Sequence, residues 1–439
     1  MQTTFTLTQL ADPQVKESEK ILRACVHCGF CLATCPTYVL LGDELDSPRG
    51  RIYLIKDMLE RAQPATAEVV KHVDRCLSCL ACMTTCPSGV HYMHLVDHAR
   101  AHIEQTYRRP LIDRALRALL ANIMPFPMRF RAALCAALLV KPLAPLFAAL
   151  GRKRFAAMLE LAPWRVPAID MVSRVYPAQG AREGRVALLA GCANTVLAPA
   201  ITQATIRVLT RHGIEVVIPP ETGCCGSLVH HMGREQAALD FARANIDAWT
   251  REIDGEGLDA ILITISGCGT TVKDYGFMLR IDSAYATNAA RVAALARDVS
   301  EYLMRLRLKP SGALPDLTVA YHSACSLQHG QRIDRAPKEL LSKMGFVVKD
   351  VPEGHLCCGS AGIYNILVPE IAKRLRTRKI GNIEKVAPDL IAAGNIGCIT
   401  QIAAGTTIPV VHPVELIDWA TGGPVPPVLQ RGSLAAASA

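Results

Sequence analysis

Eight cysteines stand in two runs of identical spacing, and thiolates arranged in this way bind metal. Both runs read C-x2-C-x2-C-x3-C-P. The short spacers bring three soft thiolates onto one [4Fe-4S] cube, and the fourth cysteine of each run reaches the other cube. The spacing therefore predicts two clusters with these ligands: Cys25, Cys28, Cys31 and Cys86 for cluster 1, and Cys76, Cys79, Cys82 and Cys35 for cluster 2.

Two zinc sites are the alternative for the same eight cysteines. A closed tetrahedral zinc site needs only paired C-x2-C elements. Zinc would leave the third cysteine, the C-x3-C step and the repeated proline of each run unexplained. We therefore expect two [4Fe-4S] clusters.

A second cysteine pattern is also duplicated, and its copies lie downstream of the first two runs. Its spacing changes by only three residues between the copies, because the first three cysteines recur 133 positions later and the last recurs 130 positions later. The two sets are Cys192, Cys224, Cys225 and Cys268, and Cys325, Cys357, Cys358 and Cys398. Such a repeat predicts two similar small domains, with a third and a fourth metal site as candidates.

Length and cysteine usage limit the class of protein. At 439 residues the chain is too long for one core and suits several modules of about 100 to 150 residues. The adjacent pairs Cys224-Cys225 and Cys357-Cys358 favour a reducing cytoplasm over a disulfide framework. Residues 1–20 are polar and lack the apolar stretch of a secretory signal, so we expect a cytoplasmic protein.

The whole positive excess of the chain lies in one apolar stretch. Residues 100–154 hold eleven Lys and Arg against Glu104 and Asp113, which equals the net charge of +9 of the whole protein. Pro142 and Pro145 would break a membrane-spanning helix. Two interpretations stay open: basic amphipathic helices on an anionic bilayer or an acidic partner, or a linker whose arginines lie in water. Cys135, alone in this stretch, is expected to be a buried thiol.

Periodicity predicts an α/β protein with a helical first module. Residues 49–61 and 66–75 carry apolar side chains at helical spacing. Each downstream repeat alternates strands and helices, which favours small parallel sheets whose end loops collect the cysteines at one edge. The predicted division is as follows: 1–105 a helical two-cluster module, 106–182 a basic helical linker, 183–310 and 311–422 the two cysteine-rich domains, and 423–439 a disordered tail.

The motifs resemble one family in particular. Ferredoxin-type runs followed by two Cys…Cys-Cys-Gly…Cys domains are similar to the iron-sulfur subunit of bacterial glycolate oxidase. The stretches that carry this resemblance are Ser-Pro-Arg-Gly-Arg at 47–51, Cys-Gly-Thr-Thr-Val-Lys-Asp-Tyr at 268–275 and Gly-Asn-Ile-Gly-Cys-Ile-Thr-Gln-Ile at 394–402. The resemblance covers about residues 18–420. Iron-sulfur subunits of lactate utilisation, anaerobic glycerol-3-phosphate dehydrogenase and heterodisulfide reductase are wider relatives.

The resemblance implies an electron-transfer subunit without a catalytic residue of its own. FAD-containing partner subunits would oxidise glycolate to glyoxylate, and this chain would pass the electrons towards a membrane quinone at the cytoplasmic face of the inner membrane. No Gly-rich dinucleotide fingerprint stands in a strand-turn-helix setting, which agrees with this division of labour. We expect the chain to be inactive alone. A related lactate or glycerol-3-phosphate dehydrogenase subunit, or a heterodisulfide-reductase-like subunit, is the alternative.

Both cysteine-rich domains depart from the heterodisulfide reductase pattern. There each domain ends in C-x2-C and holds a noncubane cluster with five thiolates, whereas here the last positions are Thr271 and Gln401. Each domain would then bind a further iron-sulfur cluster, bind zinc, or keep free thiols. A nearby oxygen, or a histidine among His322, His329 and His355, would complete a less regular site.

Three other residues have two interpretations each, and two other functions are less favoured. His27 either donates to cluster sulfur or faces solvent, and Arg49 and Arg51 either face the clusters or a flavoprotein, or lie on a solvated helix face. A thiol-disulfide reductase is weakened by the missing cysteines. A nucleic-acid-binding protein is not expected, because the aliphatic stretch 100–154 has no recognisable binding fold.

Overall fold

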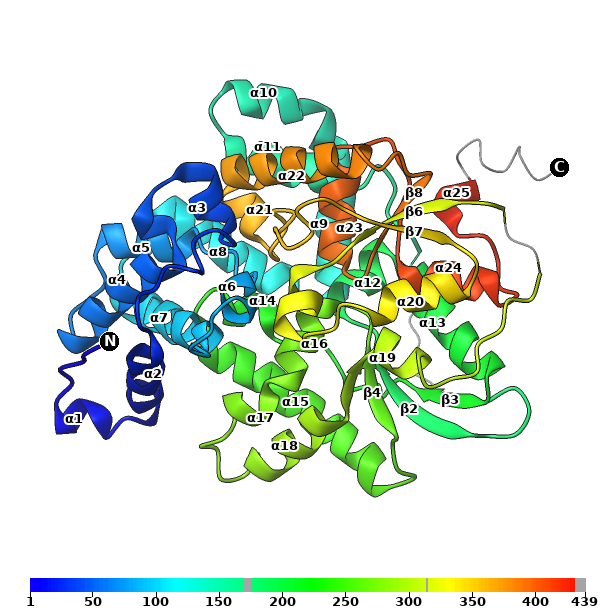
Figure 1. The fold of residues 1–439 in the computed structure, drawn as a ribbon, viewed down its shortest axis with the longest axis horizontal. Coiled ribbons are helices and arrows are strands. Elements are labelled where there is room, and N and C mark those ends of the chain that lie inside the picture. The colour runs from blue at the N-terminus through cyan, green and yellow to red at the C-terminus, as the bar shows by residue number, and fades with distance from the viewer. Residues whose placement is uncertain (169–174, 313–314, 431–439) are drawn as a thin grey trace.

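The computed structural model describes residues 1–168, 175–312 and 315–430, and it confirms the predicted α/β class. Figure 1 shows a helical N-terminal part on one side of the molecule and two sheets with surrounding helices on the other. The predicted boundaries between the modules stay a prediction.

Residues 1–106 form helices around the cysteine runs. Apolar side chains such as Ile55, Val73 and Leu95 make a small core beneath them. The helices are α1 Leu7–Leu10, α2 Pro13–Ala24, α3 Pro36–Leu41, η1 Glu44–Asp46, α4 Pro48–Glu60, α5 Ala67–Asp74, α6 Ala81–Thr84 and α7 Tyr92–Thr106. Helices α4 and α5 are the two that periodicity predicted for the spacer between the runs.

The basic stretch continues as a bent series of helices. These are α8 Leu111–Ile123, α9 Pro127–Val140, η2 Lys141–Leu143, α10 Ala144–Ala149 and α11 Lys153–Leu161. By length and composition alone, one stretch of the described residues, Pro127–Ala149, is apolar enough to span a membrane. The structure breaks that stretch at η2, where Pro142 lies, and α10 packs against α11.

Two expectations for this stretch differ from the structure. Cys135 is exposed, so the prediction of a buried thiol was wrong. The basic side chains are not all on the surface either, because Arg100, Arg109, Arg117 and Lys141 are buried. Arg109 and Arg117 form ion pairs with Asp74 at the end of α5. Part of the positive charge of this stretch is therefore neutralised inside the protein.

The first cysteine-rich repeat is a five-stranded sheet in the order β1-β3-β2-β4-β5, parallel except for β1. Its strands are β1 Val175–Tyr176, β2 Gly184–Leu189, β3 Ile214–Val217, β4 Ala260–Ile263 and β5 Ala296–Asp298. Its helices are α12 Cys192–Leu197, α13 Pro199–Arg211, α14 Ser227–His230, α15 Glu235–Asp254, α16 Ser266–Lys273, α17 Tyr275–Met278, α18 Ala286–Leu295 and α19 Val299–Leu303.

The second repeat has a four-stranded, fully parallel sheet in the order β7-β6-β8-β9. Its strands are β6 Thr318–His322, β7 Val347–Asp350, β8 Leu390–Ala393 and β9 Val410–Val411. Its helices are η3 Ser326–Gly330, α20 Ala336–Lys343, α21 Tyr364–Leu367, α22 Pro369–Glu384, α23 Ile396–Ala403, α24 Pro413–Ala420 and α25 Pro427–Gln430. The central strands share one register, since Leu189 pairs with Ile263 as His322 pairs with Ala393.

Each repeat packs one of its helices on the other repeat. Helix α24 of the second repeat packs on α13 of the first, and α19 of the first packs on α20 of the second. Asp418 on α24 binds Arg207 and Arg211 on α13 at 2.6 Å and 3.0 Å. One hydrophobic core therefore runs through both repeats.

The tail predicted to be disordered begins in ordered structure. Residues 427–430 form α25, and Leu429 is buried against the shared core. Residues 431–439 lie outside the described part of the chain, so the prediction stays open there.

Candidate metal centres

The first cysteine run gathers near the surface of the helical module. Cys25, Cys28 and Cys31 line one small cavity together with Cys82 and Cys86 of the second run. Cys28 is exposed, and the neighbouring Phe30 is 63% exposed. Cys82 and Cys86 of the second run thus both lie beside the first three cysteines of the first run, and the choice of Cys86 as the fourth ligand of cluster 1 stays a prediction.

The second run is buried deeper, with Cys35 of the first run beside it. Burial, followed by the charges of neighbouring cysteines that include Cys35, raises the pKa of the Cys79 and Cys82 thiols well above the ordinary value. Such crowded thiols lose their protons when a metal binds them. The Tyr92 hydroxyl donates to the Cys76 sulfur at 3.8 Å, and an Arg51 N–H donates to the Cys35 sulfur at 3.7 Å.

Both cysteine runs use the same unusual backbone turns. The residue directly before the second cysteine is left-handed in each run, with φ of 57° at His27 and 48° at Ser78. The residue after the second cysteine is also left-handed, Gly29 at 85° and Leu80 at 61°. Left-handed non-glycine residues cost energy and persist at functional sites. These turns aim backbone N–H groups at sulfur, and that of Ser78 lies 3.5 Å from the Cys76 sulfur.

A buried ion-pair network joins the spacer to the second site. Arg51 is 1% exposed, and its guanidinium binds the Thr37 hydroxyl at 2.9 Å, the His72 carbonyl at 2.7 Å and the Asp46 carboxylate at 3.4 Å. Asp46 also accepts from His72 at 2.9 Å and Arg75 at 2.7 Å. Arg51 therefore faces the second site, whereas Arg49 pairs with Glu44 nearer the surface.

The Ser-Pro-Arg-Gly-Arg motif is what brings Arg51 to this position. The Ser47 hydroxyl caps α4 by accepting from the Gly50 N–H, and Pro48 starts the helix. A side chain at Gly50 would lie 2.0 Å from the Glu44 carbonyl oxygen, so only glycine lets α4 approach η1 this closely. The sequence showed the motif but not its partner Asp46, since acidic residues in a spacer carry no pattern.

In the first repeat, the four cysteines come together at the carboxyl ends of β2, β3 and β4. The Cys192 and Cys224 sulfurs lie 3.7 Å apart, and the hydrogen bond from Cys192 lowers the pKa of Cys224 well below the ordinary value. Cys225 interacts with Cys268. Gly226 is left-handed and would clash with the Ala238 carbonyl if it carried a Cβ, which explains the Cys-Cys-Gly sequence.

Neutral polar groups hold the first site. Asn245 accepts from the Gly223 N–H and donates to the Cys224 carbonyl, both at 2.9 Å. The Tyr275 hydroxyl donates to the Cys225 carbonyl at 2.9 Å. Thr271 donates to the Gly267 carbonyl of its own helix and is not directed at the cysteines. The first site therefore offers four sulfurs.

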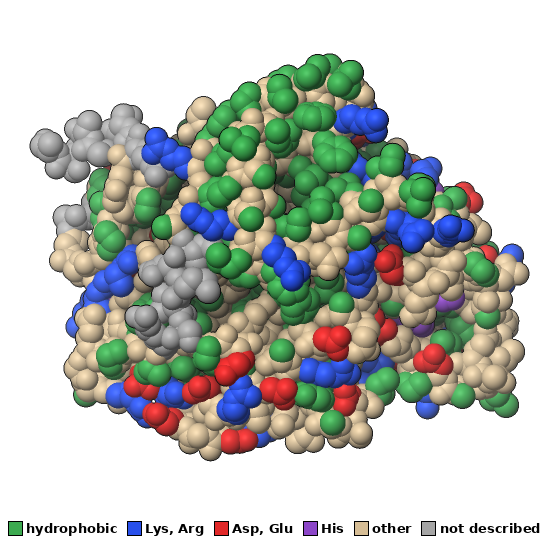
Figure 2. All heavy atoms as spheres, turned by 180° about the vertical axis from the view of Figure 1, so that it is seen from behind, with side chains coloured by type: hydrophobic (Ala, Val, Ile, Leu, Met, Phe, Trp, Pro, Cys, Tyr) green, Lys and Arg blue, Asp and Glu red, His purple; other side chains and the backbone are tan. Residues whose placement is uncertain are grey.

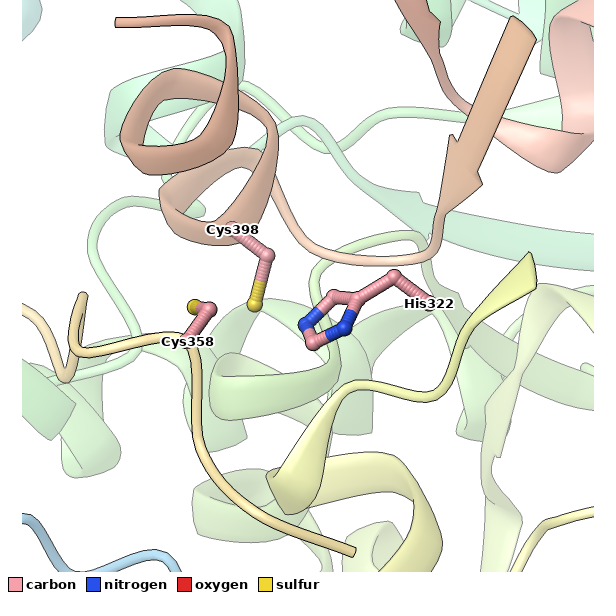
Figure 3. A group of neighbouring side chains, drawn as sticks. All are labelled: His322, Cys358 and Cys398. Carbon is pink, nitrogen blue, oxygen red and sulfur yellow. The ribbon is translucent and has the colours of Figure 1, made fainter. Parts of the chain in front are cut away.

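In the second repeat, the structure shows which of the three candidate histidines lies at the cysteine site. The Cys325 and Cys357 sulfurs lie 3.8 Å apart. The Cys358 and Cys398 sulfurs and one His322 ring nitrogen lie within 4.8 Å of one another, and Figure 3 shows the ring of His322 facing the two sulfurs. Burial lowers the pKa of His322 to about 3, so its imidazole is neutral at physiological pH.

The other candidates in the second repeat have structural partners. His329 interacts with the Thr84 hydroxyl at 2.8 Å and the His355 carbonyl at 3.1 Å, so it joins the helical module to the second repeat. Gln401 accepts from Asn365 at 3.0 Å and donates to the Ala372 carbonyl at 3.2 Å. Neither completes the cysteine site.

The second cluster site and the second repeat are direct neighbours. Cys79 and Cys357 belong to one buried cluster of side chains, with Cys325 packed against it. The two repeats also meet at their cysteine loops, where the Ser266 and Ser326 hydroxyls lie 2.7 Å apart. The cysteine sites therefore lie one after another across the molecule.

A cleft of about 840 Å³ opens beside the first-repeat site. It lies where ligands of open parallel sheets bind, outside the carboxyl ends of β2 and β3. Cys192 and Cys224 form part of its wall, Pro127 of α9 contributes another part, and most of the remaining lining is apolar.

Two cysteine runs on a helical module, joined to a duplicated cysteine-rich α/β domain, define an iron-sulfur protein. Residues 21–90 match the family described as 4Fe-4S dicluster domain. Residues 186–273 and 319–403 each match the family described as Cysteine-rich domain. The converging thiols of the two N-terminal runs suit the two [4Fe-4S] clusters of the dicluster family.

The chain belongs to the family of glycolate oxidase iron-sulfur subunits. It is 43% identical over 96% of its length to the glycolate oxidase iron-sulfur subunit of Escherichia coli (strain K12), covering 99% of that protein. It is 30% identical over 91% of its length to the probable glycolate oxidase iron-sulfur subunit of Bacillus subtilis (strain 168), covering 94% of it. A crystal structure of a hypothetical protein from Helicobacter pylori shares the fold, with a TM-score of 0.51, 10% identity, and coverage of 94% of this chain and 73% of that one.

We predict that Asp46→Asn destabilises the second cluster site. The change leaves Arg51 buried without its carboxylate, which costs about 3–5 kcal/mol in comparable buried pairs. Urea unfolding and iron content should show a lower midpoint and loss of about half of the ferredoxin-type iron. Glu44→Gln is the matched control, because Glu44 is 44% exposed and its pair with Arg49 contributes at most about 1 kcal/mol. Equal stability of the two variants would contradict the role of Asp46.

We also predict the exchange of the fourth ligands. Cys31→Ser should remove cluster 1, whereas Cys35→Ser, four residues later, should remove cluster 2, because Cys35 lies beside the second run. Redox titration followed by electron paramagnetic resonance distinguishes the surface cluster from the buried one. Loss of the same cluster in both variants would show that each run binds its own cluster.

Proposed function

We propose that this chain carries electrons from the FAD-containing subunits of a glycolate oxidase to a membrane quinone. The observation that carries the proposal is the row of cysteine sites from the exposed Cys28, through the buried Cys79, to the two repeats. When bound, iron-sulfur clusters accept and release single electrons. The protein holds their ligands in series, with Cys28 exposed at one end and most of the other ligand cysteines buried or half-buried.

The face around Cys28 is where we place the flavin-bearing partner. Val26 and Phe30 are large apolar side chains exposed beside the first cysteine run. Apolar anchors of this kind form the centres of protein interfaces. Docking there would set the partner's flavin next to the outermost site, so electrons would enter at cluster 1.

At the opposite end of the row, the surroundings of the first-repeat site favour electron transfer to a lipid-soluble acceptor. The cleft beside Cys192 and Cys224 is large and mainly apolar, which suits a quinone ring better than a charged substrate. Helix α9 contributes to the cleft wall and leads into a surface with several exposed leucines.

That surface supports contact with an anionic bilayer. Large apolar side chains stand exposed over the end of α9, η2 and α10, and we call them the apolar cap: Leu139, Leu143, Leu146 and Leu150. Figure 2 shows hydrophobic side chains over this protrusion, with Lys and Arg side chains near its base. Arg129, Arg152 and Lys153 are exposed there, and each such charge near an anionic surface contributes about 1 kcal/mol. We propose the cytoplasmic face of the inner membrane as its location.

A lactate or other 2-hydroxy-acid oxidase is the alternative, since the pocket that selects the substrate would lie on another chain. Co-purification from native cells with identification of the partners separates these readings. Recovery with a subunit whose flavin is reduced by glycolate supports the proposal. A flavin that is reduced by lactate and not by glycolate would show that glycolate is not the substrate of the complex.

We predict that Cys79→Ser interrupts the electron path in the assembled complex. Glycolate-dependent reduction of a soluble dye that takes electrons from the flavin should remain, while quinone reduction should fall at least tenfold. Co-elution with the partner subunits shows that the variant is folded. Cys135→Ser is the control, because this exposed cysteine lies outside every site. Full quinone reduction by Cys79→Ser would remove cluster 2 from the path.

We predict that the apolar cap holds the complex on membranes. Replacing Leu139, Leu146 and Leu150 together by Gln should release most of the complex from vesicles that contain anionic lipid, because their exposed apolar area is then lost. Leu111→Gln is the control, since Leu111 is 74% exposed but lies on α8, outside the cap. Unchanged flotation with vesicles would leave these helices as a linker between modules.

A further inference from the structure

His322 is a buried imidazole whose two nitrogens both lack a partner. It is 1% exposed, and neither ring nitrogen has a hydrogen bond within the described part of the chain. A buried polar group left unsatisfied costs about 1–3 kcal/mol. One nitrogen lies within 4.8 Å of the Cys358 and Cys398 sulfurs, so the group that would satisfy it must occupy the space between them.

The first repeat has no such imidazole. The residue three positions before its first cysteine is Leu189, and the strand register equates Leu189 with His322 because their partners, Ile263 and Ala393, occupy the same place in the two sheets. Leucine suits the apolar end of a buried strand. Its replacement by histidine is therefore a property of the second site rather than of the fold.

A second substitution accompanies it. Gly226 packs on Ala238 as Gly359 packs on Ala372, which equates Asn245 on α15 with Lys379 on α22. Lys379 is 2% exposed, and its ammonium donates to the Glu353 carbonyl at 2.9 Å. Burial lowers the pKa of this ammonium, and the neighbouring Cys358 and Cys357 oppose that shift. A buried cation beside several sulfurs compensates negative charge, as a thiolate-bound metal centre would supply.

We propose that the second cysteine-rich domain holds an iron-sulfur centre to which His322 contributes a fifth ligand beside Cys325, Cys357, Cys358 and Cys398. Five donors exceed the four of a structural zinc site, which favours a cluster of several irons. Binding releases one proton from each of the four thiols and none from His322, which binds as the neutral imidazole. Asn395 donates to the Cys398 sulfur at 3.5 Å and orients this ligand.

The position of this centre gives His322 a function in electron flow. Cys325 and Cys357 lie beside Cys79, so electrons that leave cluster 2 reach the second repeat first. A neutral imidazole as the fifth ligand adds no negative charge, whereas a fifth thiolate would add one, so the reduction potential stays above that of a cluster with five thiolates. His322 and Lys379 thus make the second repeat the favoured acceptor from cluster 2. This inference deepens the proposed electron-transfer function and rests on it.

The test uses the full chain, purified without oxygen from cells fed ordinary or 15N-labelled histidine. Pulsed electron paramagnetic resonance should detect nitrogen coupling that changes with the label and disappears in His322→Leu, which restores the residue of the first repeat. His322→Cys should keep the iron, lose the coupling and titrate at a lower potential. His355→Gln is the matched control and should keep the coupling, because the His355 ring is not part of the group that His322 forms with the Cys358 and Cys398 sulfurs.

Two results would overturn the inference. Histidine nitrogen coupling that persists in both His322 variants, or is absent from the parent protein, would remove His322 as a ligand. Loss of zinc instead of iron in Cys358→Ser would replace the cluster by a zinc site. If His322→Leu does not fold, His322→Cys decides the question. None of these readouts needs the partner subunits, so glycolate-dependent quinone reduction by the complex tests the proposed function separately.

Discussion

The second cluster site depends on one buried cation. Arg51 bridges the Cys35 sulfur, Thr37 and the His72 carbonyl, so a single guanidinium holds both ends of the long spacer beside the cysteines. Asp46 balances its charge, and Gly50 lets its helix come close enough. Without this bridge, the Cys35 sulfur would keep only its contacts with Thr37 and the Asp46 carbonyl, and the link from Cys35 to the His72 carbonyl at the far end of the spacer would be lost. The spacer is therefore part of the site, although it contributes no ligand.

The duplicated domains show how one scaffold acquires two chemical settings. Sheet order around the central strands, the Cys-Cys-Gly turn and the packing of that glycine are common to both. Two buried positions near the cysteines differ, because Leu189 and Asn245 of the first repeat correspond to His322 and Lys379 of the second. Buried polar groups are costly unless they are paired, so such differences mark places where the sites have diverged in function.

Much of this could be predicted from the sequence, because cysteine spacing and strand-helix alternation are local patterns. The eight ferredoxin-type cysteines, the helices of the spacer and both parallel sheets follow from such patterns. The selection of His322 over His329 and His355 could not be predicted, since it depends on which ring faces the sulfurs after folding. Cys135 was misjudged for a related reason: an apolar stretch reads as core, and here it covers a protruding surface.

The packing of α19 and α24 across the two repeats has a consequence for how the protein unfolds. Each repeat completes the other's hydrophobic layer, and Asp418 is held by arginines more than two hundred residues away along the chain. Neither half can melt while the other stays intact, because the loss of one uncovers the apolar face of its neighbour. The duplicated halves thus form a single cooperative unit. A protein with only one of the repeats would lack the helix that covers part of its apolar surface.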